Sequence, residues 1–184
     1  MLAVSIILVC VASGFTLVTS IMKDMRKILL CIVVACITTA VNYLLSNNAG
    51  GLSGFATYII ATAVAVTSGI FAIKKKAVPM SVIVIYCLAY TVTNILTWAD
   101  WYTILAILGA ITGVICNTRD NGMSYHIWVL ANSFLWCCYD VFAQTYAPLA
   151  QHLIFTAIFM AGLGRDIYKL KKEKKQNGCN TSNN

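Results

Sequence analysis

Apolar runs long enough to cross a bilayer follow one another along almost the whole chain. A membrane-spanning helix needs roughly 20 mostly apolar residues. Seven such runs lie at about residues 2–22, 28–46, 52–73, 78–98, 100–117, 123–144 and 147–168, of which the fifth is the least clear. Because no alternating strand pattern occurs and a backbone in lipid must satisfy its own hydrogen bonds, these runs predict an all-α integral membrane protein with seven transmembrane helices in one domain, residues 1–168.

Basic residues occupy every second connection between these runs. All 13 lie at Lys23, Arg26, Lys27, Lys74, Lys75, Lys76, Arg119, Arg165, Lys169, Lys171, Lys172, Lys174 and Lys175. The other connections, at about 46–51, 99–100 and 145–147, carry none. The positive-inside rule therefore predicts an N-terminus outside the membrane and a C-terminus in the cytoplasm. The net charge of +7 comes from short basic clusters between apolar runs and not from one basic face of a folded domain. We therefore expect the lipid bilayer as partner and no nucleic acid.

The last residues, 169–184, form a basic tail. Its polar end cannot build a core, so we expect a partly disordered cytoplasmic tail, without order beyond about residue 176. Its lysines either contact anionic lipid headgroups or act as a plain retention anchor.

The cysteines and histidines do not predict a metal or a cofactor. Of the eight cysteines, all but Cys179 lie in apolar runs, without a Cys-x-x-Cys pair, and this indicates small packing residues. His126 and His152 fall at opposite faces of the predicted membrane domain, too far apart for a shared metal. No nucleotide-binding loop or hydrolytic motif occurs, so we do not expect an enzyme.

The run from Tyr125 to Asp140 is the least lipid-like part of the chain. At 100° per residue, one side of this helix carries Trp128, Asn132, Trp136 and Tyr139, and Asp140 lies beside that stripe. Two interpretations remain open. The stripe is either a seam between helices, where Asn bonds to a neighbour and the aromatic rings fill space, or one wall of a path for a polar solute.

Each residue of the stripe has both interpretations. Asn132 lies near the predicted midplane and offers donors and an acceptor to a neighbour or to a solute. Trp128 and Trp136 flank it and either stack on a sugar or ring, or anchor the helix at an interface. Asp140 is either a site for a cation or proton or a carboxylate that water reaches from outside. Asn42, in the second run, is a further candidate, with helix–helix hydrogen bonding as the alternative.

The two halves of the chain resemble each other weakly. A shift of 96 residues places Tyr43 on Tyr139, and a shift of 97 places Leu52 on Leu149. We therefore predict a 3+1+3 arrangement with parallel repeats. A first bundle at about 1–76 and a second at about 100–168 are joined by a linker helix at about 78–98, the pattern known from SWEET-type transporters.

Three short patterns carry a resemblance to a known family. They are Val-Asn-Tyr-Leu-Leu at 41–45, Trp-Cys-Cys-Tyr-Asp at 136–140, and a last helix that ends Gly-x-x-Ile-Tyr at 164–168 before basic residues. Over most of residues 20–172 the chain resembles the YgjV family of small bacterial inner-membrane proteins, whose function is not established. This resemblance implies location in the inner membrane and a seven-helix fold related to the SWEET, PQ-loop and PnuC-type transporters.

These observations predict a transporter or facilitator for a neutral sugar-like, nucleoside-like or vitamin-precursor solute. Transport would proceed by alternating access of the two three-helix bundles, in a monomer or a homodimer. The competing hypothesis is a scaffold or interaction protein of the inner membrane that transports nothing. A transporter requires a central cavity at midplane depth lined by both bundles, whereas a scaffold is filled there.

Overall fold

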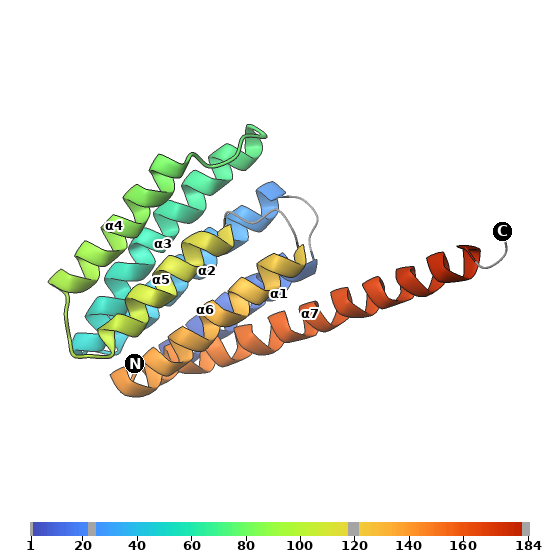
Figure 1. The fold of residues 1–184 in the computed structure, drawn as a ribbon. Helices are drawn as coiled ribbons and strands as arrows, with labels where there is room; N and C mark the ends of the chain where they lie inside the picture. Colours follow the sequence, from blue (N-terminus) through green and yellow to red (C-terminus); the bar gives the residue numbers. More distant parts are fainter. Residues whose placement is uncertain (1, 22–24, 118–121, 182–184) are drawn as a thin grey trace.

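The computed structural model describes residues 2–21, 25–117 and 122–181, with side-chain surroundings for all of these except residues 2, 20–21, 25–29, 117, 122–126, 169 and 172–181. These ranges form seven helices (Figure 1): α1 (Leu2–Ile21), α2 (Met25–Leu45), α3 (Ala49–Ile73), α4 (Met80–Leu96), α5 (Thr103–Asn117), α6 (Gly122–Ala143) and α7 (Tyr146–Thr181). They contain no strand, so the all-α class and the seven predicted helices are confirmed.

Two described stretches are long and apolar enough to cross a bilayer. They are Ala49–Ile73, with a mean hydropathy of 1.9 over its most apolar window, and Tyr146–Tyr168, with 1.4. The remaining apolar helices have 10–17 described residues each. α7 continues to Thr181 and projects beyond the other helices (Figure 1), whereas the sequence predicted disorder after about residue 176. The lysine, glutamate and glutamine residues at 169–176 favour continuation of the helix beyond Tyr168, whereas residues 177–181 have low helix propensity and their sequence does not explain the last turn.

Six helices form a closed ring, and α4 lies outside it. α2 packs between α1 and α3, and α6 packs between α5 and α7. The ring is closed by the pairs α1–α7 and α3–α5, while α2–α7 and α3–α6 make smaller contacts. α4 packs only on α3 and α5 among the described residues, and it lies at the edge of the bundle in Figure 1. Apart from the contacts of α4, the contacting pairs α1–α2, α2–α3, α1–α7 and α2–α7 have counterparts in α5–α6, α6–α7, α3–α5 and α3–α6.

The α2–α3 and α6–α7 connections have the same backbone form. Asn47 (φ 50°) and Gln144 (φ 56°), 97 positions apart, both adopt the left-handed conformation that reverses the chain. The amide of Leu52 then donates to Asn48 O at 3.1 Å, and that of Leu149 donates to Thr145 O at 3.0 Å. The α3–α4 connection with lysines 74–76 lies at one end of the bundle, which we call the basic end. The α2–α3 and α6–α7 connections lie at the other end, which we call the opposite end.

The interior holds several large polar side chains, whereas the exterior is apolar. Tyr43, Tyr139, His152, Gln151 and Asn42 are the five largest fully buried side chains. By contrast, Leu30, Met80 and Leu96 are 66%, 72% and 80% exposed. This distribution is the reverse of that in a soluble domain and places apolar side chains where lipid would contact them.

Candidate functional site

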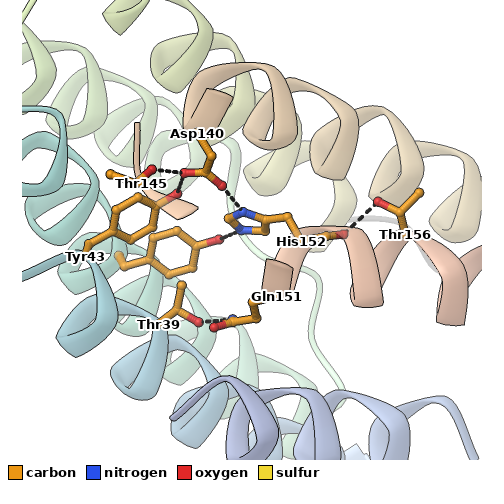
Figure 2. A network of polar contacts seen from close by, with 8 residues as sticks. Thr39, Tyr43, Asp140, Thr145, Gln151, His152 and Thr156 are labelled. Carbon is orange, nitrogen blue, oxygen red and sulfur yellow. Dashed lines mark hydrogen bonds and ion pairs between the residues drawn. The ribbon is translucent and has the colours of Figure 1, made fainter. Parts of the chain in front are cut away.

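The Asp140 carboxylate is the centre of a buried polar network near the opposite end. Asp140 lies in the last turn of α6 and is 0% exposed. Its Oδ1 accepts from the hydroxyls of Tyr43 (2.7 Å) and Thr145 (2.6 Å), and its Oδ2 lies 2.6 Å from His152 Nδ1 (Figure 2). Three partners from α2, the α6–α7 connection and α7 therefore meet one carboxylate. A carboxylate has enough lone pairs to accept from all of them.

His152 extends this network towards α3. Its Nε2 lies 2.6 Å from the Tyr58 hydroxyl, while its Nδ1 contacts Asp140. The imidazole also stacks on the Trp136 indole, with ring centroids 5.7 Å apart and an interplanar angle of 22°. A continuous polar chain thus runs from Asp140 through His152 to Tyr58, and it is held in orientation by an aromatic ring.

Tyr43 fits beneath Asp140 because α3 carries a glycine opposite it. A Cβ on Gly54 would meet the Tyr43 ring closer than atoms can approach. The ring also stacks on Tyr58, with centroids 5.4 Å apart. Gly54 therefore lets the Tyr43 ring lie flat against α3 with its hydroxyl on Asp140.

A central cavity of about 170 Å³ lies next to this network, on the side towards the basic end. All seven helices contribute to its lining. Tyr58, Trp136 and His152 line it where the network begins, and Thr19, near the end of α1, lines it towards the basic end. The polar chain from Asp140 therefore ends at the wall of a space deep enough to receive a small molecule.

Asn132 both lines the cavity and bonds to α5. Its amide nitrogen donates to Gly109 O (2.5 Å) and to Thr112 Oγ1 (3.2 Å). Side-chain atoms of Trp136 and Asn132 lie about 3.0 and 3.1 Å from where Cβ atoms on Gly109 and Gly113 would be, so the two glycines permit this approach of α5 to α6. Both interpretations of Asn132 remain open, because its carbonyl oxygen is not used in these two bonds.

The other predicted site residues do not line the cavity. Trp128 is partly buried on α6, and Tyr139 donates its hydroxyl to Gly50 O at 2.6 Å. Asp140 lies behind His152. The alternative that Asp140 is a carboxylate reached by water from outside is wrong, because neighbouring side chains enclose it fully.

Asn42 makes none of the helix–helix hydrogen bonds that were its alternative role. It is fully buried, yet neither Oδ1 nor Nδ2 has a partner, and the Oε1 of buried Gln151 has none either. Gln151 uses its amide nitrogen to donate to Thr39 Oγ1 (Figure 2). A buried amide without partners is destabilising, so these groups are candidates for bonds in a second conformation of the bundle.

Sequence reasoning missed Tyr43, Tyr58 and His152. One signal was available for His152: an ionisable group inside a membrane segment usually pairs with another such group. Asp140 and His152 are such a pair in neighbouring predicted runs. The tyrosines carry no comparable signal, because tyrosine is common in apolar helices for packing alone. The side chain of His126, discussed with His152 as a metal ligand, lies outside the described side chains.

A family comparison matches almost the whole chain. The family model Imp-YgjV, described as a bacterial inner membrane protein, matches residues 3–174. No curated protein and no solved structure matches the chain. The matched range includes α2 to α6 completely, most of α1 and α7, and every residue of the network and the cavity lining.

Proposed function

Because the chain belongs to the Imp-YgjV family of bacterial inner membrane proteins, we propose that it is a membrane transporter or facilitator for a small neutral solute, which binds in the central cavity. The observation that carries the proposal is the cavity itself, to which all seven helices contribute. A protein that served only as a scaffold has no need of such a space at the centre of its bundle, because filling it with side chains would increase dispersion contacts.

The size of the cavity favours a solute with one ring. A cavity of roughly 150 Å³ lined by apolar side chains can hold benzene, and this one measures about 170 Å³. A sugar-like ring or a vitamin precursor with one ring fits this size better than a nucleoside, which joins a base to a sugar. Solutes with two rings would require the bundle to open further.

The lining favours a solute with a flat face and a few polar groups. Trp136 and Tyr58 contribute aromatic rings to the lining, with ring centroids 5.2 Å apart. Asn132, Thr39 and Thr57 also line the cavity and carry hydroxyl or amide groups. Few convergent polar groups in an otherwise apolar pocket are typical of sites for small uncharged molecules.

Alternating access is supported by the equivalent surroundings of the two halves of the ring. In this proposal, bundle α1–α3 rocks against bundle α5–α7, and α4 is the linker helix. By the positive-inside rule the basic end faces the cytoplasm. In this orientation the cavity extends towards the cytoplasm, and the Asp140 network seals it from the outside.

A thermal-shift screen of the purified protein in detergent tests this function. The screen compares monosaccharides, single-ring amides and vitamin precursors, nucleosides and amino acids. A solute at a hundred times its Kd should add about 2.7 kcal/mol to the free energy of unfolding. Uptake of the stabilising class into proteoliposomes is the second measurement.

A pair of matched variants separates a solute site from a packing seam. Ala61 lines the cavity, and Ala131 is exposed on α6. Ala61→Leu should fill part of the cavity, keep the protein folded and abolish the response to the solute, whereas Ala131→Leu should respond like the parent. If no solute stabilises the parent, while Asn132→Ala and Trp136→Ala only lower the melting temperature, the stripe is a seam and the scaffold hypothesis replaces this one.

A further inference from the structure

We propose that Asp140 and His152 form a proton-binding site, and that its proton sets the direction of the hydrogen bond made by Tyr58 at the cavity wall. A solute in the cavity would then bind together with a proton. The coupling of proton and solute rests on the function proposed above, whereas the proton site itself does not.

The hydrogen bonds around His152 allow two states that differ by one proton. Asp140 accepts at Oδ1 from two hydroxyls, so Oδ2 is the acceptor for an N–H at His152 Nδ1. When Nε2 carries no proton, it accepts from the Tyr58 hydroxyl, 2.6 Å away. When Nε2 takes up a proton from water, it donates to Tyr58 Oη instead. The hydroxyl hydrogen of Tyr58 must then turn elsewhere, and the cavity lies beside it.

A proton on His152 leaves the pair without net charge. With neutral His152 the network carries one negative charge in a fully buried place, and with protonated His152 its net charge is zero. No described lysine or arginine contacts Asp140 or His152. The titratable side chains that face them are Cys36 and Tyr43 of α2, Tyr58 of α3, and Cys137 and Tyr139 of α6. None of these side chains supplies a positive charge. Since an isolated charge inside a membrane is costly, a proton on His152 is the local means of neutralising Asp140.

Proton binding changes what Tyr58 offers to a solute. With neutral His152 the hydroxyl donates to the imidazole and presents only an acceptor to the cavity. With protonated His152 it accepts from the imidazole and can donate to a carbonyl or hydroxyl oxygen of a solute. Because linkage is reciprocal, a solute that accepts from Tyr58 and a proton on His152 each strengthen binding of the other. A transporter with this arrangement carries a proton together with its solute.

Nitrogen NMR of histidine tests the proton site without any solute. The chain contains two histidines, so the variant His126→Gln leaves His152 as the single source of imidazole signals. Spectra are recorded from about pH 8 to about pH 5, and we expect the ¹⁵N signals of His152 to show two protonated nitrogens in the state that has bound the proton and one in the state that has not. Asp140→Asn should suppress this change. The proposal is overturned if His152 keeps one protonated nitrogen over this range while the protein stays folded, or if Asp140→Asn titrates like the parent.

Binding of benzamide tests the coupling. Benzamide has one neutral ring and a carbonyl acceptor, and its affinity should increase by up to about tenfold for each unit by which the pH falls, the limit for one linked proton. Tyr58→Phe should abolish this pH dependence. Tyr86→Phe is the matched control and should retain it, because the Tyr86 hydroxyl bonds to Thr67 away from the network.

The outcomes separate this proposal from the transport proposal. Benzamide binding that is independent of pH in the parent overturns the coupling. If neither benzamide nor any solute in the screen binds, the proposed transport function fails, and the NMR titration still supports or overturns the proton site.

Discussion

The Asp140 carboxylate lies 2.6 Å from the His152 imidazole, and the two side chains are 0% and 2% exposed. The pair joins the last turn of α6 to α7, next to the connection in which Gln144 reverses the chain. Because Thr145 of the same connection also donates to Asp140, the carboxylate fixes the geometry of the α6–α7 hairpin. The same side chain is therefore a structural anchor for this hairpin and one end of the polar chain to the cavity.

Removal of the carboxylate should destabilise the protein strongly. Asp140→Ala leaves the donors of Tyr43, Thr145 and His152 without an acceptor, and loss of one partner of a buried pair typically costs about 3–5 kcal/mol. Asp140→Asn retains a carbonyl acceptor and should cost less. Thermal unfolding in detergent measures both changes, with Asp100→Asn in the exposed α4–α5 connection as control. Equal stabilities of Asp140→Ala and the parent would exclude the anchoring role.

Loss of one hydroxyl should have a smaller effect. Tyr43→Phe removes one of the three donors to Asp140 but keeps the ring that stacks on Tyr58. We expect a loss of about 1.5–3 kcal/mol in the free energy of unfolding, typical of a hydrogen bond to a charged group. Tyr146→Phe is the control, because Tyr146 is 71% exposed at the same end of the bundle. Similar melting temperatures for the two variants would contradict the assigned role of the Tyr43 hydroxyl.

Two glycines on different helices should respond in opposite ways to alanine. Gly54→Ala places a methyl group against the Tyr43 ring, and overpacking of this kind typically costs about 1–3 kcal/mol. A Cβ on Gly164 meets nothing within 4 Å, so Gly164→Ala should stabilise α7 by up to about 1 kcal/mol through helix propensity. The comparison of the two melting temperatures checks both. Destabilisation by Gly164→Ala would indicate a contact at that position.

Replacement of Asn42 should increase stability in the conformation described here. Its amide is fully buried without a hydrogen-bond partner, and the penalty for such a group is about 1–3 kcal/mol. Asn42→Leu has a similar shape and lacks the polar atoms, so we expect a higher melting temperature together with slower solute uptake if the amide is bonded in a second conformation. A lower melting temperature for Asn42→Leu would show instead that a partner satisfies the amide in this conformation.

The architecture could be predicted in large part from the sequence. The all-helical class follows from the length of the apolar runs, because a backbone in lipid must satisfy its own hydrogen bonds. The length of a run is a local property that consecutive residues determine. The predicted connections near residues 46–51 and 145–147 agree with the reversals at Asn47 and Gln144. The end of α7 at Thr181 was less predictable, because residues 177–181 are poor helix formers.

The site was predicted only in part. Periodicity on one helix correctly placed Asn132 and Trp136 on a common face, and both line the cavity. It also placed Tyr139 beside them, but that side chain reaches away to the start of α3 and bonds to Gly50. Helical spacing defines which residues share a face, but it does not define which neighbour that face meets.

The sequence by itself determined the all-helical class, the order of the seven helices and the concentration of polar groups in α6. Only the tertiary structure decided that Asp140 is enclosed by Tyr43, Thr145 and His152, and that His152 leads to Tyr58 at the cavity. Tyr43 and Asp140 are 97 residues apart, and Tyr58 and His152 are 94 apart. Such partners are chosen by the packing of whole helices, because burial of a carboxylate is tolerated only where the surrounding helices bring enough donors to it.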